Sequence, residues 1–167
     1  MRKLSTFLAA LTILLGAFLV SAQPAAAAGH RCAVIGTSGV YQGVHCIDVY
    51  RDGPFAASDN SVYCQKVQNG VTTIVACKSL REQPGTCSNA YAQCAYSGRG
   101  ECGSAGHSPC RAAKIVNSSP VIALKCGYDY WGITANTYIV LPNGVPTSTA
   151  SIATPHFAVG NTNCTTD

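Results

Sequence analysis

The sequence has few charged residues and no concentration of positive charge. Charged residues make up 11% of the chain, with eleven Lys and Arg against seven Asp and Glu. Arg2 and Lys3 lie in an N-terminal leader, and without them nine basic and seven acidic residues remain. The remaining basic residues are scattered, whereas nucleic-acid and membrane-surface binding need clustered ones. We therefore expect no nucleic-acid partner and no membrane partner.

Motifs for nucleophilic catalysis and metal binding are also absent. The chain has no G-x-S-x-G serine motif and no closely spaced cysteine or histidine pairs of the kind that bind zinc. It also lacks a D-x-D calcium loop, and an even cysteine count leaves no thiol free to act as a nucleophile. We expect no metal and no cofactor, and we interpret the chain as non-catalytic.

Acid–base pairs are scarce as well. His45 and Asp48 are three residues apart in a predicted strand, so they point to opposite faces, and we expect His45 to be a hydrogen-bonded structural residue. A pair of carboxylates would suit glycoside hydrolysis, but Glu82 and Glu101 are the only glutamates. Glu101 lies in a glycine-rich stretch, where we expect it to be solvated. The other histidines are isolated in the sequence: His30, His107 and His156.

What is present begins with a secretory leader. Arg2 and Lys3 precede an apolar run from Phe7 to Val20, and an alanine-rich stretch ends at Ala28. This order is typical of a cleavable signal peptide, and a transmembrane anchor is the less favoured alternative. We expect residues 1–28 to be removed and residues 29–167 to form one secreted domain, large enough for a hydrophobic core. The alanine-rich style resembles bacterial leaders, and no cysteine stands immediately after the cut to carry a lipid, since the first one is Cys32.

All ten cysteines follow this leader, as expected for disulfides formed in an oxidising compartment. We expect five bridges that supplement the core, each adding on the order of 2–4 kcal/mol. The pairing is left open by the sequence. The cysteines are Cys32, Cys46, Cys64, Cys77, Cys87, Cys94, Cys102, Cys110, Cys126 and Cys164.

Strand patterns dominate, and the clearest is a hairpin. Two β-rich runs, Ser61–Gln68 and Val71–Lys78, flank Asn69-Gly70, the strongest two-residue hairpin turn. In this register Cys64 and Cys77 are diagonal neighbours about 7–8 Å apart. That distance is long for a bridge, so we expect each to bond a cysteine of another strand.

Further short strands favour a mainly β fold, an antiparallel sandwich or barrel stapled by disulfides. We expect turns at Asn117–Pro120 and at Pro142–Gly144. The segment Pro84–Pro109, rich in Gly, Ser and Cys, is expected to be a loop region held by bridges. The predicted strands are Cys32–Ile35, Val44–Tyr50, Arg111–Val116, Val121–Cys126, Thr134–Leu141 and Ser151–Val159, the last broken at Pro155.

One cluster of aromatic and acidic residues is a candidate binding surface. Tyr128, Asp129, Tyr130 and Trp131 are consecutive, and Trp131 is the only tryptophan. Aromatic rings provide contact area at low entropic cost and could stack on a sugar or hold a protein partner.

Together these patterns predict a secreted, monomeric binding protein whose partner is an extracellular protein or glycan. One alternative is an inhibitor of an extracellular protease, acting through a rigid loop within Cys87–Cys110. A second is a small secreted hydrolase with an unfamiliar site.

Overall fold

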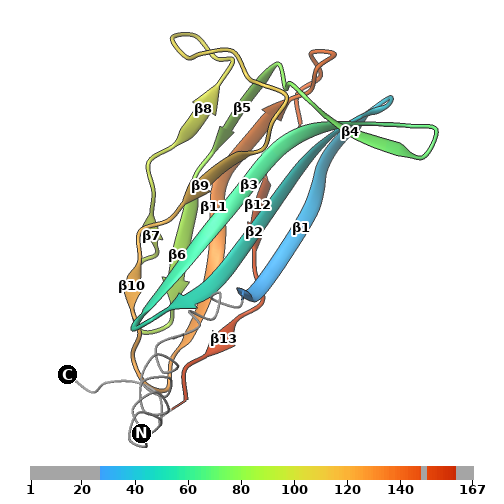
Figure 1. The fold of residues 1–167 in the computed structure, drawn as a ribbon. Helices are drawn as coiled ribbons and strands as arrows, with labels where there is room; N and C mark the ends of the chain where they lie inside the picture. Colours follow the sequence, from blue (N-terminus) through green and yellow to red (C-terminus); the bar gives the residue numbers. More distant parts are fainter. Residues whose placement is uncertain (1–26, 148–149, 161–167) are drawn as a thin grey trace, which may run out of the picture.

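The computed structural model describes residues 27–147 and 150–160, which form two antiparallel sheets packed face to face (Figure 1). This confirms the mainly β, disulfide-stapled sandwich; the sheets do not close into a barrel. These residues contain no helix, and therefore none that could cross a membrane. Most of the predicted leader lies outside the described residues, but Ala27 and Ala28 already belong to the first strand.

The first sheet is built on two long neighbouring strands, β2 and β3, which pair over twelve residue positions. One side of β2 carries β1, and three short segments follow one another along the free side of β3. The six strands are β1 (Ala27–Ser38), β2 (Tyr41–Asp52), β3 (Phe55–Gln68), β4 (Val71–Val75), β9 (Ile115–Ser118) and β10 (Ile122–Ala123).

The second sheet is organised around β11, which is paired on both sides. β5 and β6 follow one another on one side, and β12 and β13 pair with it as well. The seven strands are β5 (Ser79–Glu82), β6 (Pro84–Ser88), β7 (Ala95–Tyr96), β8 (Gly100–Cys102), β11 (Asp129–Val140), β12 (Ala150–Ala153) and β13 (Phe157–Ala158).

The Asn69-Gly70 hairpin is confirmed, but the expectation for its cysteines is wrong. Gln68 faces Val71 as predicted. However, Cys64 and Cys77 bond each other, with Cα atoms 5.3 Å apart. The reason is that β4 ends at Val75, so Cys77 is no longer held at its ladder position and can approach Cys64.

The predicted turn at Asn117–Pro120 is not a chain reversal. β9 and β10 both run antiparallel to β3, and the register shifts by one residue between Ser118 and Ile122. The segment is therefore one edge strand interrupted by a bulge. Pro120 is tolerated there because an edge position does not require its missing N–H. The turn at Pro142–Gly144 is confirmed by the hydrogen bond from Gly144 N to Leu141 O, 2.8 Å.

The segment Pro84–Pro109 is only partly the stapled loop region expected. Its first five residues form β6, which is buried throughout and pairs with β11. The remainder is held by two short-range disulfides, Cys87–Cys94 and Cys102–Cys110. Cys32–Cys46 is the fourth bridge within the described residues. Cys126 is disulfide-bonded as well, and Cys164 lies outside the described residues.

The interior between the sheets is divided along its length. An apolar cluster around Leu80, Ile139 and Leu141 occupies the end near β4. Another, around Tyr130 and Leu124, occupies the end near β10. Between them lies a band of buried polar residues, which we call the polar band. Its members are His45, Ser58, Asn60, Glu82, Thr86, Ser119, Thr134 and Thr137.

Candidate functional site

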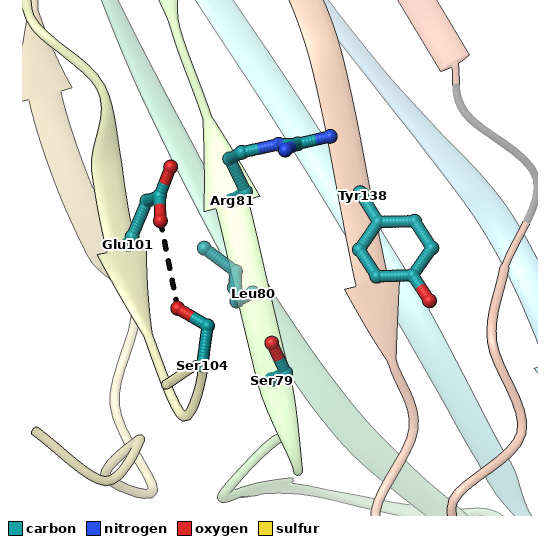
Figure 2. A pocket seen from close by; sticks show the side chains of 6 residues that line it. All are labelled: Ser79, Leu80, Arg81, Glu101, Ser104 and Tyr138. Carbon is teal, nitrogen blue, oxygen red and sulfur yellow. Dashed lines mark hydrogen bonds between the residues drawn. The ribbon is translucent and has the colours of Figure 1, made fainter. Parts of the chain in front are cut away.

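An open pocket of about 300 Å³ lies on the outer face of the second sheet. β5, β8 and β11 provide its floor, and the loop closed by Cys102–Cys110 provides one wall. Leu80 is buried and the other lining residues are half-buried. Figure 2 shows the lining residues: Ser79, Leu80, Arg81, Glu101, Ser104 and Tyr138.

Strand register explains why these residues meet. Arg81 on β5 lies directly opposite Tyr138 on β11 and directly opposite Glu101 on β8. Residues directly opposite in antiparallel strands share a face. The three side chains therefore form a row across the outer face, while Leu80 and Glu82 point inward.

Arg81 is the unusual member of this row. Its side chain is directed away from Glu101 and across β11 (Figure 2). Among the described residues it has no ion pair and no hydrogen bond, and its Nε is buried without a partner. A buried donor left unpaired costs about 1–3 kcal/mol. Arg81 is therefore a half-buried cation in the pocket lining that no group among the described residues pairs with.

Glu101, in contrast, is already partnered on its own side of the pocket. Its Oε2 lies 3.3 Å from His107 Nε2 and accepts a hydrogen bond of 3.5 Å from Ser104 Oγ. A catalytic serine requires the histidine between the hydroxyl and the carboxylate. Here the carboxylate lies between them, so this cluster is not arranged for a serine nucleophile. It instead fixes the loop against β8.

The predicted aromatic cluster is divided between two faces. Tyr130 is fully buried in the apolar cluster near β10, where it stacks on Phe157 with centroids 5.5 Å apart. Trp131 is half-buried and stacks on His156 at 4.4 Å. Asp129 is half-buried and Tyr128 is exposed. The structure thus leaves three of the four side chains accessible, and they do not line the pocket.

Two further residues considered from the sequence, His45 and Glu82, lie in the polar band. His45 is fully buried, and burial lowers its pKa to about 4. Its Nδ1 is 3.5 Å from Thr134 Oγ1, but Nε2 has no partner among the described residues, so it is not the fully hydrogen-bonded histidine expected. Asp48 faces outward, as predicted.

Glu82 is a fully buried carboxyl between the sheets. Burial raises its pKa, although hydrogen bonds from Asn60 and Asn117 act in the opposite direction. Asn60 Nδ2 donates to Oε2 at 2.5 Å and Asn117 Nδ2 donates to Oε1 at 2.9 Å. These bonds occupy both oxygens, so Glu82 links β3, β5 and β9 and has no open side for a substrate.

Sequence reasoning missed Arg81 and Tyr138 and assigned Glu101 only to solvent. No local motif connects them, because the row depends on the register of three strands that are far apart in the chain. The described residues contain no cluster of three or more His, Cys, Asp or Glu side chains that could hold a metal.

Comparisons of the chain with protein-family models, with curated proteins and with solved structures find no match.

Proposed function

We propose that this chain is a secreted, non-catalytic binding protein that holds a small extracellular ligand with a carboxylate in the Arg81 pocket. The four disulfides are consistent with an oxidising, extracellular environment. The unpartnered guanidinium of Arg81 is the observation that supports this ligand chemistry, because Arg pairs with carboxylates through two parallel hydrogen bonds.

The shape of the site favours a small ligand over a protein surface. Ligand pockets are concave and begin at about 300 Å³, which is the size of this pocket. Tyr138 offers a ring, and Ser79 offers a hydroxyl group, beside the cation. The Cys102–Cys110 bridge reduces the ordering cost of the loop that forms the wall.

The test uses two probes that differ only in the charged group. D-glucuronate and D-glucose are titrated into isotope-labelled protein while amide chemical shifts are followed, with acetate as a third probe for the carboxylate alone. We expect glucuronate and acetate to shift the amides of Ser79, Arg81 and Tyr138, and glucose to leave them unchanged. No shift with glucuronate or acetate contradicts the proposal.

The matched variants are Arg81→Gln and Lys66→Gln. Arg81→Gln removes the charge and should weaken glucuronate binding by roughly tenfold or more. Lys66 lines a different hollow at the β3–β4 hairpin, so Lys66→Gln removes the same charge elsewhere and should have no effect. Equal effects of both variants would mean that net charge, and not the pocket, attracts the probe.

A protease inhibitor is the second candidate, because the loop between Cys102 and Cys110 is exposed enough to enter the active site of a protease. Residues 105–109 are exposed, and the loop is braced by a hydrogen bond from Gly103 N to Ser108 O, 2.8 Å. An inhibitor should form a stable complex with a secreted serine protease on size-exclusion chromatography, and His107→Asp should abolish it. Cleavage of the loop without a complex counts against this function.

A further inference from the structure

On the outer face of the first sheet, at the start of β1, a disulfide lies beside a histidine–carboxylate pair. Cys32 on β1 is directly opposite Cys46 on β2, and His30 is directly opposite Asp48. The four residues form a square, since residues two apart in a strand share a face. This square is on the other sheet from the Arg81 pocket and is independent of it.

The histidine connects the carboxylate to the sulfur. His30 Nδ1 lies 2.5 Å from Asp48 Oδ1, and His30 Nε2 lies 3.2 Å from Cys32 Sγ. Asp48 therefore fixes the ring in the orientation that directs Nε2 at the sulfur. Nδ1 is the donor to the carboxylate, as in the acid–histidine–nucleophile arrangement of activated thiols.

One sulfur of this bridge is also accessible from solvent. Cys32 is exposed, whereas its partner Cys46 is buried beneath it. The Cys64–Cys77 bridge of the same sheet is a direct comparison, because its sequence separation is 13 residues against 14. Chain entropy therefore stabilises the two bridges equally. They differ in environment, since Cys64 is fully buried in the apolar cluster.

We propose that Cys32–Cys46 is a thiol–disulfide exchange site that oxidises extracellular thiols, with Cys32 as the attacked sulfur and His30 as the positioning residue for the Cys32 thiolate. An external thiolate bonds to Cys32 Sγ, and the S–S bond breaks to release Cys46 as a thiolate, which takes up a proton. A second external thiol then displaces Cys32 from the mixed disulfide.

The overall reaction converts two external thiols and the protein disulfide into one external disulfide and two protein thiols. Two external thiols lose two electrons and two protons, and the protein bridge gains both. The second external thiol gives its proton to His30 Nε2 as it attacks, while Nδ1–H stays hydrogen-bonded to Asp48. The resulting imidazolium stabilises the released Cys32 thiolate by a hydrogen bond from Nε2 and can pass the proton on to it. Stabilising the reduced form makes a disulfide a stronger oxidant. β1 is joined to β2 by a ladder that extends well beyond the bridge on both sides, so we expect the reduced protein to stay folded.

Other ionisable groups near the square are few. Asp59 on β3 lies opposite Asp48, and Tyr50 lies two residues along β2 on the same face. Burial first, and then the charges of Asp59 and Asp52, raise the pKa of the Tyr50 phenol, so it stays neutral at physiological pH. Arg31 points elsewhere, since its Nη1 donates to Ala153 O at 3.3 Å. His30 is thus the ionisable group placed against the sulfur.

The first experiment compares the bridges within one molecule. The mature protein is equilibrated with mixtures of reduced and oxidised glutathione, free thiols are alkylated, and each cysteine is quantified by peptide mass spectrometry. We expect Cys32 and Cys46 to be alkylated at potentials that leave Cys64 and Cys77 bridged. Equal reduction of the two bridges would overturn the proposal.

The second experiment isolates His30. In His30→Gln the equilibrium constant for oxidation of glutathione by Cys32–Cys46 should fall roughly tenfold at pH 7, because the Cys32 thiolate loses its partner. Its pH dependence between pH 6 and 9 should change as well. His107→Gln is the matched control, since His107 also pairs with a carboxylate, Glu101, at an exposed position. A wild-type constant and pH profile in a folded His30→Gln protein would overturn the proposal.

Discussion

The two ends of the sandwich interior and the band between them are built from different chemistry. The end near β4 is filled by aliphatic residues and two disulfides. The band holds an amide, several hydroxyls, a histidine and a carboxyl, all of which are also buried. Apolar burial gives stability that does not depend on pH. Buried ionisable groups make stability depend on pH, so the band and the ends should respond differently to acid.

The band also contains a close approach of the two sheets. A Cβ at Gly132 of β11 would lie 2.8 Å from Ser58 Oγ of β3 and 3.1 Å from Ile47 Cδ1 of β2. Glycine is therefore required at position 132, where β11 passes over the linked hydroxyls of Ser58, Thr86 and Ser119, which we call the hydroxyl cluster. In the polar band the two sheets are also joined by hydrogen bonds, from Asn60 Nδ2 to Glu82 Oε2 and from Thr86 Oγ1 to Ser58 Oγ.

The largest effect is expected at the apolar end. Ile139→Ala removes a fully buried side chain between the sheets and should lower the free energy of unfolding by about 2–5 kcal/mol. This loss should be the same at pH 5 and pH 8, because no ionisable group is involved. Urea unfolding at both pH values measures it. A strongly pH-dependent loss would show that the apolar end is energetically coupled to the ionisable groups of the polar band.

The second-largest effect on the free energy of unfolding is expected from protonation of His45. Because burial lowers its pKa from 6.5 to about 4, the unfolded chain binds a proton between these values that the folded chain does not. Stability is therefore complete above pH 6.5 and falls by about 3 kcal/mol as the pH drops to about 4. His45→Leu should abolish this loss in urea unfolding, whereas His156→Gln, at an exposed position, should retain it.

Glu82 should act in the opposite direction. Its pKa is raised above 4.5, so the folded state keeps its proton at pH values where the unfolded chain has lost it. This group's contribution is therefore most favourable below pH 4.5 and declines as the pH rises. Subtracting the unfolding free energies of Glu82→Gln from those of the wild type between pH 4 and 8 should reveal this decline. A flat difference would mean that Glu82 has the same pKa in both states.

The smallest effect is expected for a neutral member of the band. Ser119 Oγ accepts a hydrogen bond from Ser58 N at 3.1 Å and pairs with Thr86 Oγ1. Ser119→Ala should cost about 1 kcal/mol and should not change the pH dependence of unfolding. A pH-dependent cost would indicate that the hydroxyl cluster is coupled to Glu82 or His45.

The fold class was predictable because its determinants are local. Asn69-Gly70 fixes the hairpin register by turn geometry alone, and Pro142–Gly144 forms the predicted turn. Where a strand ends is not encoded so locally. The departure of the chain from the ladder after Val75 placed Cys77 against Cys64, and the continuation of β9 into β10 past Pro120 depends on β3.

The polar band and the pocket could not be predicted, because both depend on which distant strands pair. Glu82 lies in a segment for which no strand was predicted, and its hydrogen-bonding partners come from β3 and β9. The square of His30, Cys32, Cys46 and Asp48 could have been predicted from less information. Once Cys32 is paired with Cys46 in antiparallel strands, His30 and Asp48 must be opposite each other, since each lies two residues from a bridged cysteine. Disulfide connectivity would have been sufficient to find it.

The division of the free side of β3 among β4, β9 and β10 bears on whether another molecule can pair with this edge of the sheet. A long, regular edge strand is a template for pairing with another molecule and hence for aggregation. Here the edge consists of three segments of five, four and two residues. Pro120 offers no N–H where two of them meet. This edge therefore has no long run of regularly spaced donors and acceptors, which disfavours pairing with another chain along it.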